Sequence, residues 1–288
     1  MFTAALGAPE TALLAGLAGL LVGSFLNVVI RRVPIMLERD WAEQCAELAR
    51  DAEAREAEAR GATATAPSSP PFNVIEPRSH CPHCRAPIAA KHLVPVLSWL
   101  VLHGRCSSCS ATIGARYPLV ELGTAIIFAV VALRFPLDIS LLGALTVSGF
   151  LIALAMIDFD THYLPDQLTL PLLWLGLAAS VIAPLTPNVD PTQAILGAIA
   201  GYLSLWSVHH AFRLLTGKEG MGYGDFKLLA ALGAWLGMPS ILPIVLLAAI
   251  AGSIVGLVGI FAYGRHRDLP IAFGPFLAAA GWLVMTFG

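Results

Sequence analysis

Long apolar runs separated by short polar breaks occupy most of this 288-residue chain. The first run, Leu13 to Ile30, ends at two arginines and has the length of a transmembrane helix, which needs about 20 apolar residues. Seven further runs lie at approximately 118–135, 139–157, 167–184, 192–213, 225–238, 240–262 and 270–287. The pattern predicts an all-α polytopic membrane protein with about eight transmembrane helices, one of which, at 225–238, is short and tilted or partly inserted.

One polar region interrupts the apolar pattern. Strong helix formers and eight of the 19 acidic residues fall in 38–60, which predicts a solvated charged helix. A Pro-bounded linker follows at 61–71, before a compact segment, 81–109, that bears four cysteines. The predicted domains are a first transmembrane helix (1–30), a cytoplasmic domain (31–117) and a polytopic membrane domain of about seven helices (118–288).

Composition narrows the class of protein. The chain is 57% hydrophobic and only 12% charged, with a mean hydropathy of +0.76. Soluble globular proteins carry roughly 25% charged residues, so much of this surface must face lipid rather than water. The apolar content also excludes a disordered chain, and the net charge of -2 argues against a nucleic-acid binder.

The basic residues orient the chain in the membrane. If the N-terminus lies outside, 16 of the 17 Lys and Arg residues fall on or beside the cytoplasmic side, including those of the turn at 264–268, and only Arg134 lies outside. The first run is not a cleaved signal peptide, because no basic residue precedes it and the charges follow it.

Four cysteines form two Cys-x-x-Cys pairs in the polar region. This spacing is typical of a tetrahedral zinc site with four thiolate ligands, each pair on a tight turn. Four protein ligands leave no open position for substrate, so we expect a structural metal. The predicted ligands are Cys81, Cys84, Cys106 and Cys109. The fifth cysteine, Cys45, receives no role.

Acidic residues cluster at the predicted cytoplasmic ends of the membrane helices. Asp158 ends an apolar run, and Asp225 follows the glycine-rich sequence GMGYG. Two carboxylates that come close together cannot both ionise easily, so one can hold a proton while the other acts as a base on water. Asp158 and Asp225 are the favoured functional pair, whereas Asp160 and Asp166 fit turn or cap positions. Glu121 is expected to have a structural role, paired with a basic side chain, and His209 and His210 are expected to pack.

Several sequence blocks resemble the bacterial type IV prepilin peptidases, which are membrane aspartic peptidases with a Gly-x-Gly-Asp motif. The similar blocks, besides the four-cysteine segment, are GSFLNVVIRRVP (23–34), ARYPLVELGTA (115–125), IDFDTHYLPDQLTLPLLWLGL (157–177), GMGYGDFKLLAALGAWLG (220–237) and PIAFGPFLAAAG (270–281). The charged segment 38–60 departs from the family by its length.

The resemblance implies a bifunctional enzyme of the bacterial inner membrane. Such enzymes cleave the leader of prepilins and pseudopilins after a glycine, then methylate the new N-terminal amine, usually of Phe, with S-adenosylmethionine. The family's catalytic aspartates fall on Asp158 and Asp225, at the cytoplasmic face, with a periplasmic N-terminus. Similarity places methylation in the cytoplasmic segment, where the turn containing Gly104 and Arg105 is a candidate for contact with the methyl donor.

Two other functions fit parts of the sequence. A proton-coupled or ion transporter would use the same acids as a relay, but it predicts acids near the middle of the bilayer and paired broken helices. A membrane-anchored zinc scaffold would explain the cysteines and leave Asp158 and Asp225 without a role.

Overall fold

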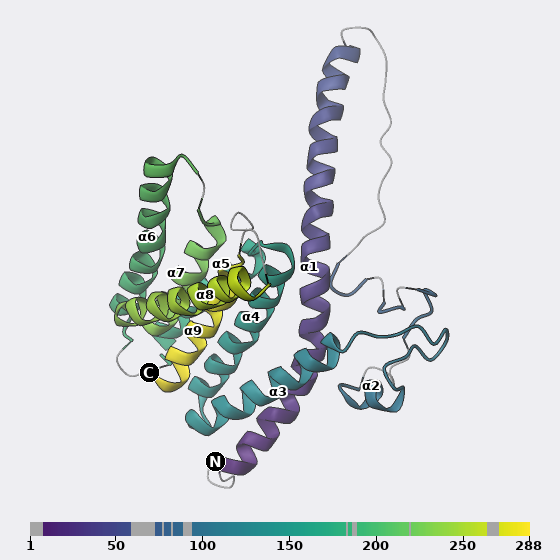
Figure 1. The fold of residues 1–288 in the computed structure, drawn as a ribbon, viewed down its shortest axis with the longest axis horizontal. Helices are drawn as coiled ribbons and strands as arrows, with labels where there is room; N and C mark the ends of the chain where they lie inside the picture. Colours follow the sequence, from purple (N-terminus) through teal and green to yellow (C-terminus); the bar gives the residue numbers. More distant parts are fainter. Residues whose placement is uncertain are drawn as a thin grey trace.

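The computed structural model describes residues 8–58, 73–76, 78–81, 83–88, 94–182, 184–185, 189–218, 220–263 and 271–288. These residues form helices without a β-strand (Figure 1). The helices are α1 (Ala8–Glu58), α2 (Leu97–Val101), α3 (Arg116–Arg134), α4 (Ile139–Thr161), α5 (Asp166–Ile182), α6 (Pro191–Thr216), α7 (Tyr223–Leu236), the 3-10 helix η2 (Met238–Ser240), α8 (Ile241–Tyr263) and α9 (Gly274–Phe287). The predicted linker at 61–71 and the turn at 264–268 lie outside the described residues.

Helix α1 joins two elements that the sequence pattern separates. Its 51 residues include both the first apolar run and the charged segment, and Pro34 lies inside it without ending it. At 1.5 Å per residue α1 is about 75 Å long, more than twice the roughly 30 Å hydrocarbon core of a bilayer. The change from apolar to charged residues therefore marks where the helix leaves the membrane and not where the helix ends.

The membrane helices agree with a polytopic protein. Among the described residues, five helical segments are long and apolar enough to cross a bilayer: Ala8–Asp51, Arg116–Arg134, Ile139–Thr161, Pro191–Thr216 and Met238–Ala262. Helices α5 and α9 are shorter apolar helices. Together with the short α7, they bring the number of apolar helices among the described residues to the eight expected.

Helix α7 lies in the centre of the bundle, and most of its residues are buried. Glycines let it pack closely on α6, since a Cβ on Gly197 would clash with the carbonyl oxygen of Gly233. Small residues at helix contacts bring backbones together in this way in membrane proteins. The close packing fixes the depth at which α7 begins, and Asp225 lies in its first turn.

The segment that bears the four cysteines lies beside α1, because α3, which follows this segment, packs along α1 (Figure 1). Gly19 and Gly23 of α1 allow the approach, since a Cβ on either would come within 2.8 Å of the α3 backbone at Ala125 or Glu121. The remaining helices, α4 to α9, form a bundle on the other side of α1.

Candidate functional site

Asp158 lies in the last turn of α4 and is 5% exposed. The helix ends three residues later, where His162 takes the left-handed conformation and its N–H donates to the carbonyl of Asp158. The side chain of Asp158 meets the beginning of another helix: the backbone N–H of Gly274 donates to Oδ2 at 2.9 Å. Because the N-terminus of a helix attracts negative charge, the start of α9 can interact favourably with this carboxylate when the carboxylate is ionised.

Asp225 lies in the first turn of α7 and is 6% exposed. The glycine-rich sequence before it is needed for close contact with the loop between α4 and α5, since a Cβ on Gly224 would lie 2.6 Å from the Cβ of Leu164. This contact brings the two predicted functional segments together. Asp225 is close enough to Asp158 for their charges to interact.

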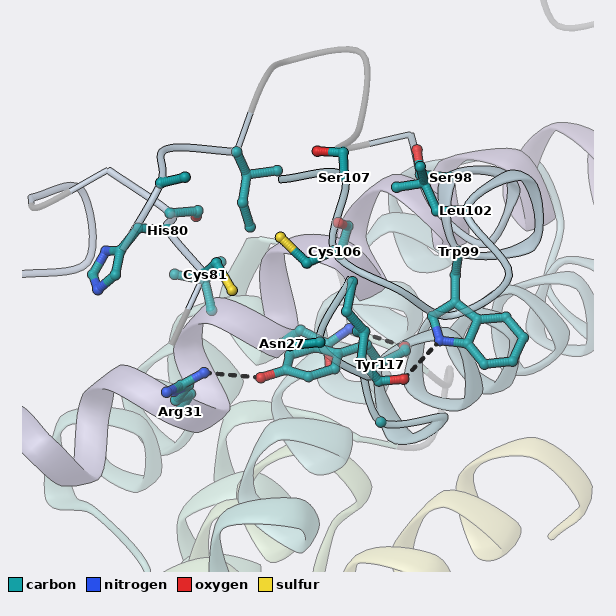
Figure 2. A pocket seen from close by; sticks show the side chains of 18 of the residues that line it. Asn27, Arg31, His80, Cys81, Ser98, Trp99, Leu102, Cys106, Ser107 and Tyr117 are labelled. Carbon is teal, nitrogen blue, oxygen red and sulfur yellow. Dashed lines mark hydrogen bonds between the residues drawn. The ribbon is translucent and has the colours of Figure 1, made fainter. Parts of the chain in front are cut away.

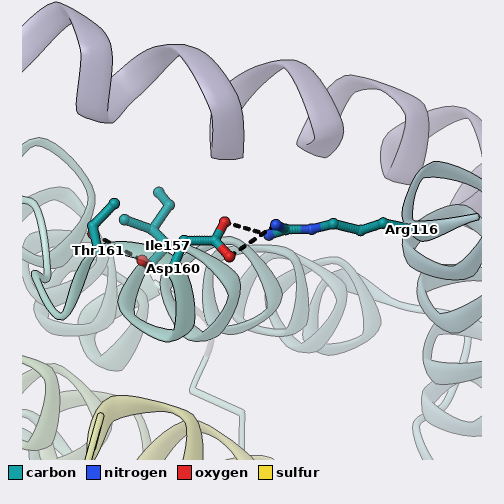
Figure 3. Close-up of polar contacts among 4 residues, drawn as sticks. All are labelled: Arg116, Ile157, Asp160 and Thr161. Atoms are coloured by element: carbon teal, nitrogen blue, oxygen red, sulfur yellow. Dashed lines mark hydrogen bonds and ion pairs between the residues drawn. The ribbon is translucent and has the colours of Figure 1, made fainter. Parts of the chain in front are cut away.

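The other two acids of these segments have a different environment. Asp160 is paired with Arg116, whose two terminal nitrogens donate to the two carboxylate oxygens (Figure 3). Asp166 is paired with Lys227, at 2.6 and 2.7 Å. Of the four acids, only Asp158 and Asp225 are both buried and adjacent, which is the arrangement that a shared proton requires.

The two Cys-x-x-Cys pairs form two turns with matching hydrogen bonds. In the first, the N–H of Cys81 donates to the carbonyl of Ala86 and the N–H of Arg85 donates to that of Cys81. In the second, the N–H of Cys106 donates to the carbonyl of Ala111 and the N–H of Ser110 donates to that of Cys106. Both turns have a positive φ at the same position, on Arg85 and Ser110. The repeated geometry is that of two metal-binding knuckles.

The four cysteine sulfurs could hold a metal ion, since they all lie within 4.8 Å of one another. Those of Cys81 and Cys109 are 3.8 Å apart, close to the roughly 3.8 Å that tetrahedral coordination with Zn–S bonds of about 2.3 Å requires. The backbone N–H groups of Cys84 and His83 lower the pKa of the Cys81 thiol to about 6. The donor set therefore fits zinc, which binds thiolates.

Gly104 and Arg105, the candidates for donor contact, belong to the turn before the second knuckle. Gly104 has a φ of +66°, and a Cβ there would lie 3.0 Å from Cζ2 of Trp99. Arg105 forms an isolated β-bridge with Thr112. Gly104 thus supports the position of an aromatic side chain, while Arg105 is part of the knuckle backbone.

The remaining candidates have local roles. Glu121 is buried, and its Oε2 accepts a hydrogen bond from the N–H of Val96 at 2.7 Å, so its partner is a backbone group and not the basic side chain considered from sequence. His209 is buried against the ring of Phe226, as a packing residue would be. His210 stacks on the indole of Trp206.

Sequence reasoning did not identify Gly274 as part of the site. A Cβ on Gly274 would lie 2.6 Å from Oδ2 of Asp158, so glycine alone lets the helix start approach the carboxylate. The Gly-Pro pair in the block 270–281 does indicate that a helix begins there, because proline is common in the first turn of a helix. Nothing in the sequence said which side chain that helix start would contact.

Comparisons with known proteins match nearly the whole chain. Residues 17–135 match the bacterial Peptidase A24 N-terminal domain, and residues 145–257 match the type IV leader peptidase family. The chain is 50% identical to a prepilin leader peptidase/N-methyltransferase of Aeromonas hydrophila, over 94% of this chain and 89% of that protein. Proteins of the same name from Pseudomonas aeruginosa and Neisseria gonorrhoeae are 47% and 45% identical, over 94% and 95% of this chain and 89% of each protein. No solved structure matches the chain.

Proposed function

Because the chain belongs to the type IV leader peptidase family, we propose that it is a bifunctional membrane enzyme that removes the leader from prepilins and pseudopilins and then N-methylates the exposed N-terminal residue, usually Phe. The single observation that carries the peptidase half is the burial of Asp158 beside Asp225 at the ends of two helices. The relatives' names support this enzyme and give no support to the transporter alternative.

In the proposed peptidase step, Asp158 is the base. The hydrogen bond from Gly274 and the start of α9 favour its ionised form, so the shared proton is assigned to Asp225. Asp158 takes a proton from water as the water oxygen bonds to the scissile carbonyl carbon, and Asp225 donates its proton to the carbonyl oxygen. When the tetrahedral intermediate collapses, the C–N bond breaks, the leaving amine takes the proton held by Asp158, and a hydroxyl of the intermediate returns its proton to Asp225. The products are a leader carboxylic acid and a free amine.

The location of the two aspartates suits a substrate that is part polar and part apolar. In the proposed topology the N-terminus is periplasmic and the ends of α4 and the start of α7 face the cytoplasm of a bacterium, at the inner membrane. A basic leader would remain in the cytoplasm while the apolar helix of a prepilin lies in the bilayer. The scissile bond between them would then reach the depth of Asp158 and Asp225.

The metal proposed for the four cysteines is zinc with a structural role. Cys81, Cys84, Cys106 and Cys109 would hold it, and four thiolates close its coordination shell. The ion would fix the two knuckles relative to each other in a segment that has little core of its own: of the four cysteines, only Cys81 is buried.

The second proposed activity needs S-adenosylmethionine, which supplies an electrophilic methyl group. The residues of this chain would bind the donor and hold the new N-terminal amine in its neutral, nucleophilic form. No step of leader cleavage depends on the donor, so the two activities can be measured separately.

The proposed function is tested with full-length protein purified in detergent, a prepilin and radiolabelled S-adenosylmethionine. We expect a shortened prepilin that carries the label on its N-terminal residue. A transporter or a scaffold would produce neither change. Cleavage without transfer of the label would reject the methyltransferase activity alone and leave the peptidase activity supported.

A further inference from the structure

A cavity of about 460 Å³ lies between α1, the two knuckles and the beginning of α3 (Figure 2). This volume falls in the range of about 300–1,000 Å³ that is typical of small-molecule sites. The dyad of Asp158 and Asp225 does not line the cavity, so the cavity is a second site that leader cleavage leaves unused. Among the residues that line it are Arg31, Trp99, Tyr117 and Glu121.

The cavity has fixed charges of both signs. Arg31 projects from α1 and donates from Nη1 to the hydroxyl of Tyr117 at 3.0 Å. A guanidinium has five N–H donors, so Arg31 can bind a carboxylate while it keeps this bond. Glu121 is 8% exposed, and its carboxylate, which can accept about four hydrogen bonds, accepts one from Val96. A buried carboxylate that lines a cavity favours a cationic ligand group.

The cavity also has an aromatic wall in a fixed orientation. The indole N–H of Trp99 donates to the carbonyl of Ile113 at 3.0 Å, and Gly104 packs against the edge of the same ring. The backbone carbonyl of Tyr117 accepts from the side chain of Asn27, which ties the start of α3 to α1. A rigid aromatic face attracts cations and stacks with flat heterocycles.

We propose that this cavity binds the methyl donor, a sulfonium nucleoside that carries an amino acid group, with Arg31 at its carboxylate, Glu121 at its cationic groups and Trp99 beside its aromatic base. The proposal rests on the proposed methyltransferase activity. The ligand's features match those of the cavity one by one: a carboxylate, an ammonium and a sulfonium, and a purine. A basic leader peptide fits poorly, because α1 also brings Arg32 and Arg39 to the same cavity.

The location links the donor to both the metal and the peptidase site. Cys81 and Cys106 form part of the wall, so a metal that orders the knuckles would also shape the cavity (Figure 2). Tyr117 follows Arg116, whose partner Asp160 lies two residues after Asp158. The ion pair between Arg116 and Asp160 therefore connects the end of α4, which bears Asp158, to the start of α3, which bears Tyr117 of the donor cavity.

The test measures binding of the donor and not only activity. Full-length protein in detergent is titrated with S-adenosylhomocysteine by calorimetry, and labelled S-adenosylmethionine is cross-linked to the wild-type protein by ultraviolet light and mapped by peptide sequencing. Glu121→Gln keeps the size of the side chain, and the glutamine oxygen can still accept from Val96, while Arg31→Gln removes the positive charge and keeps a shorter polar side chain. Arg50→Gln and Glu47→Gln are matched controls on the exposed part of α1.

We expect each cavity variant to weaken binding by about tenfold or more, as the loss of one charge-assisted hydrogen bond does, while both controls bind like the wild type. Cross-links should map to the peptides that contain Trp99 or Tyr117, and leader cleavage should persist in the variants. Equal affinity in all variants, or cross-links confined to other peptides, would overturn the cavity assignment and leave the methyltransferase activity intact. A wild-type protein that neither binds donor nor transfers methyl would reject both.

Discussion

Arg116 and Asp160 join the two halves of the protein through a bidentate ion pair (Figure 3). Arg116 begins α3, directly after the segment that bears the four cysteines, and Asp160 lies in the last turn of α4, two residues after Asp158. The pair is partly exposed, with side-chain exposures of 45% and 30%, so it contributes roughly 0–1 kcal/mol to stability. The pair links the start of α3, which follows the cysteine segment, to the end of α4.

Breaking this ion pair should separate the two activities. We expect Arg116→Gln or Asp160→Asn to leave leader cleavage within about threefold of the wild type, since an exposed pair has a small effect on stability, and to raise the fraction of cleaved but unmethylated pilin. Mass spectrometry of the mature N-terminus measures that fraction. The double exchange Arg116→Asp with Asp160→Arg should restore methylation in part, and an unchanged product ratio in both single variants would count against the coupling.

The catalytic assignment predicts that each aspartate of the dyad is indispensable. Asp158→Asn and Asp225→Asn should each lower cleavage by roughly three orders of magnitude or more, because neither remaining carboxyl group can complete the proton transfer. Cleavage of a prepilin in membranes measures this loss. Asp166→Asn is the matched control, since it removes a carboxylate from the same segment but breaks only the ion pair with Lys227. Near-normal processing by both dyad variants would show that the assignment is wrong.

Gly274 should be sensitive to the smallest substitution. In Gly274→Ala the new methyl group would lie 2.6 Å from Oδ2 of Asp158, so the carboxylate must move and its hydrogen bond to the backbone weakens. We expect cleavage to fall by about tenfold to a hundredfold, the effect of displacing a catalytic group by a fraction of an ångström to 1 Å.

Gly149→Ala provides the comparison for this variant. Gly149 lies on the same helix as Asp158, and a Cβ there meets nothing within 4 Å, so its replacement should leave the kinetics unchanged. Initial rates with one prepilin substrate compare the two variants. Equal rates for Gly274→Ala and Gly149→Ala would mean that the contact between α9 and Asp158 does not support catalysis.

Metal removal should affect methylation before cleavage. The purified protein should contain about one zinc per chain, and Cys84→Ser or Cys109→Ser should lower that content, because a tetrahedral site needs all four ligands. Donor binding and methylation should fall together, since the knuckles form part of the cavity wall. Elemental analysis beside both activity assays measures this.

Cys45→Ser is the control, since Cys45 is an exposed cysteine on α1, distant in sequence from the knuckles. It should keep its zinc and both activities. A metal-free wild-type protein with full methyltransferase activity would be incompatible with a structural zinc.

The sequence by itself determined the features that depend on neighbouring residues. Apolar runs of helical length indicated a polytopic protein, and the spacing of the cysteines predicted a four-ligand site. The structure brings the sulfurs of Cys81, Cys84, Cys106 and Cys109 together as such a site requires. The acids Asp158 and Asp225 stood out because an ionisable residue at the end of an apolar run is costly without a function. The helical fold and the grouping of the cysteines are confirmed because helix length and ligand spacing are local, whereas the catalytic role of the two aspartates stays a prediction.

Only the tertiary structure decided the contacts between distant segments. The approach of Gly274 to Asp158 spans 116 positions of the chain, and the bond from Asn27 to Tyr117 spans 90. Both depend on how whole helices pack, which local patterns do not encode. The same holds for α1, whose polarity changes near Arg31 although its backbone hydrogen bonding continues to Glu58. The polarity of each part of α1 follows from its own side chains, whereas the path of the backbone and the cavity beside it depend on how the helices pack.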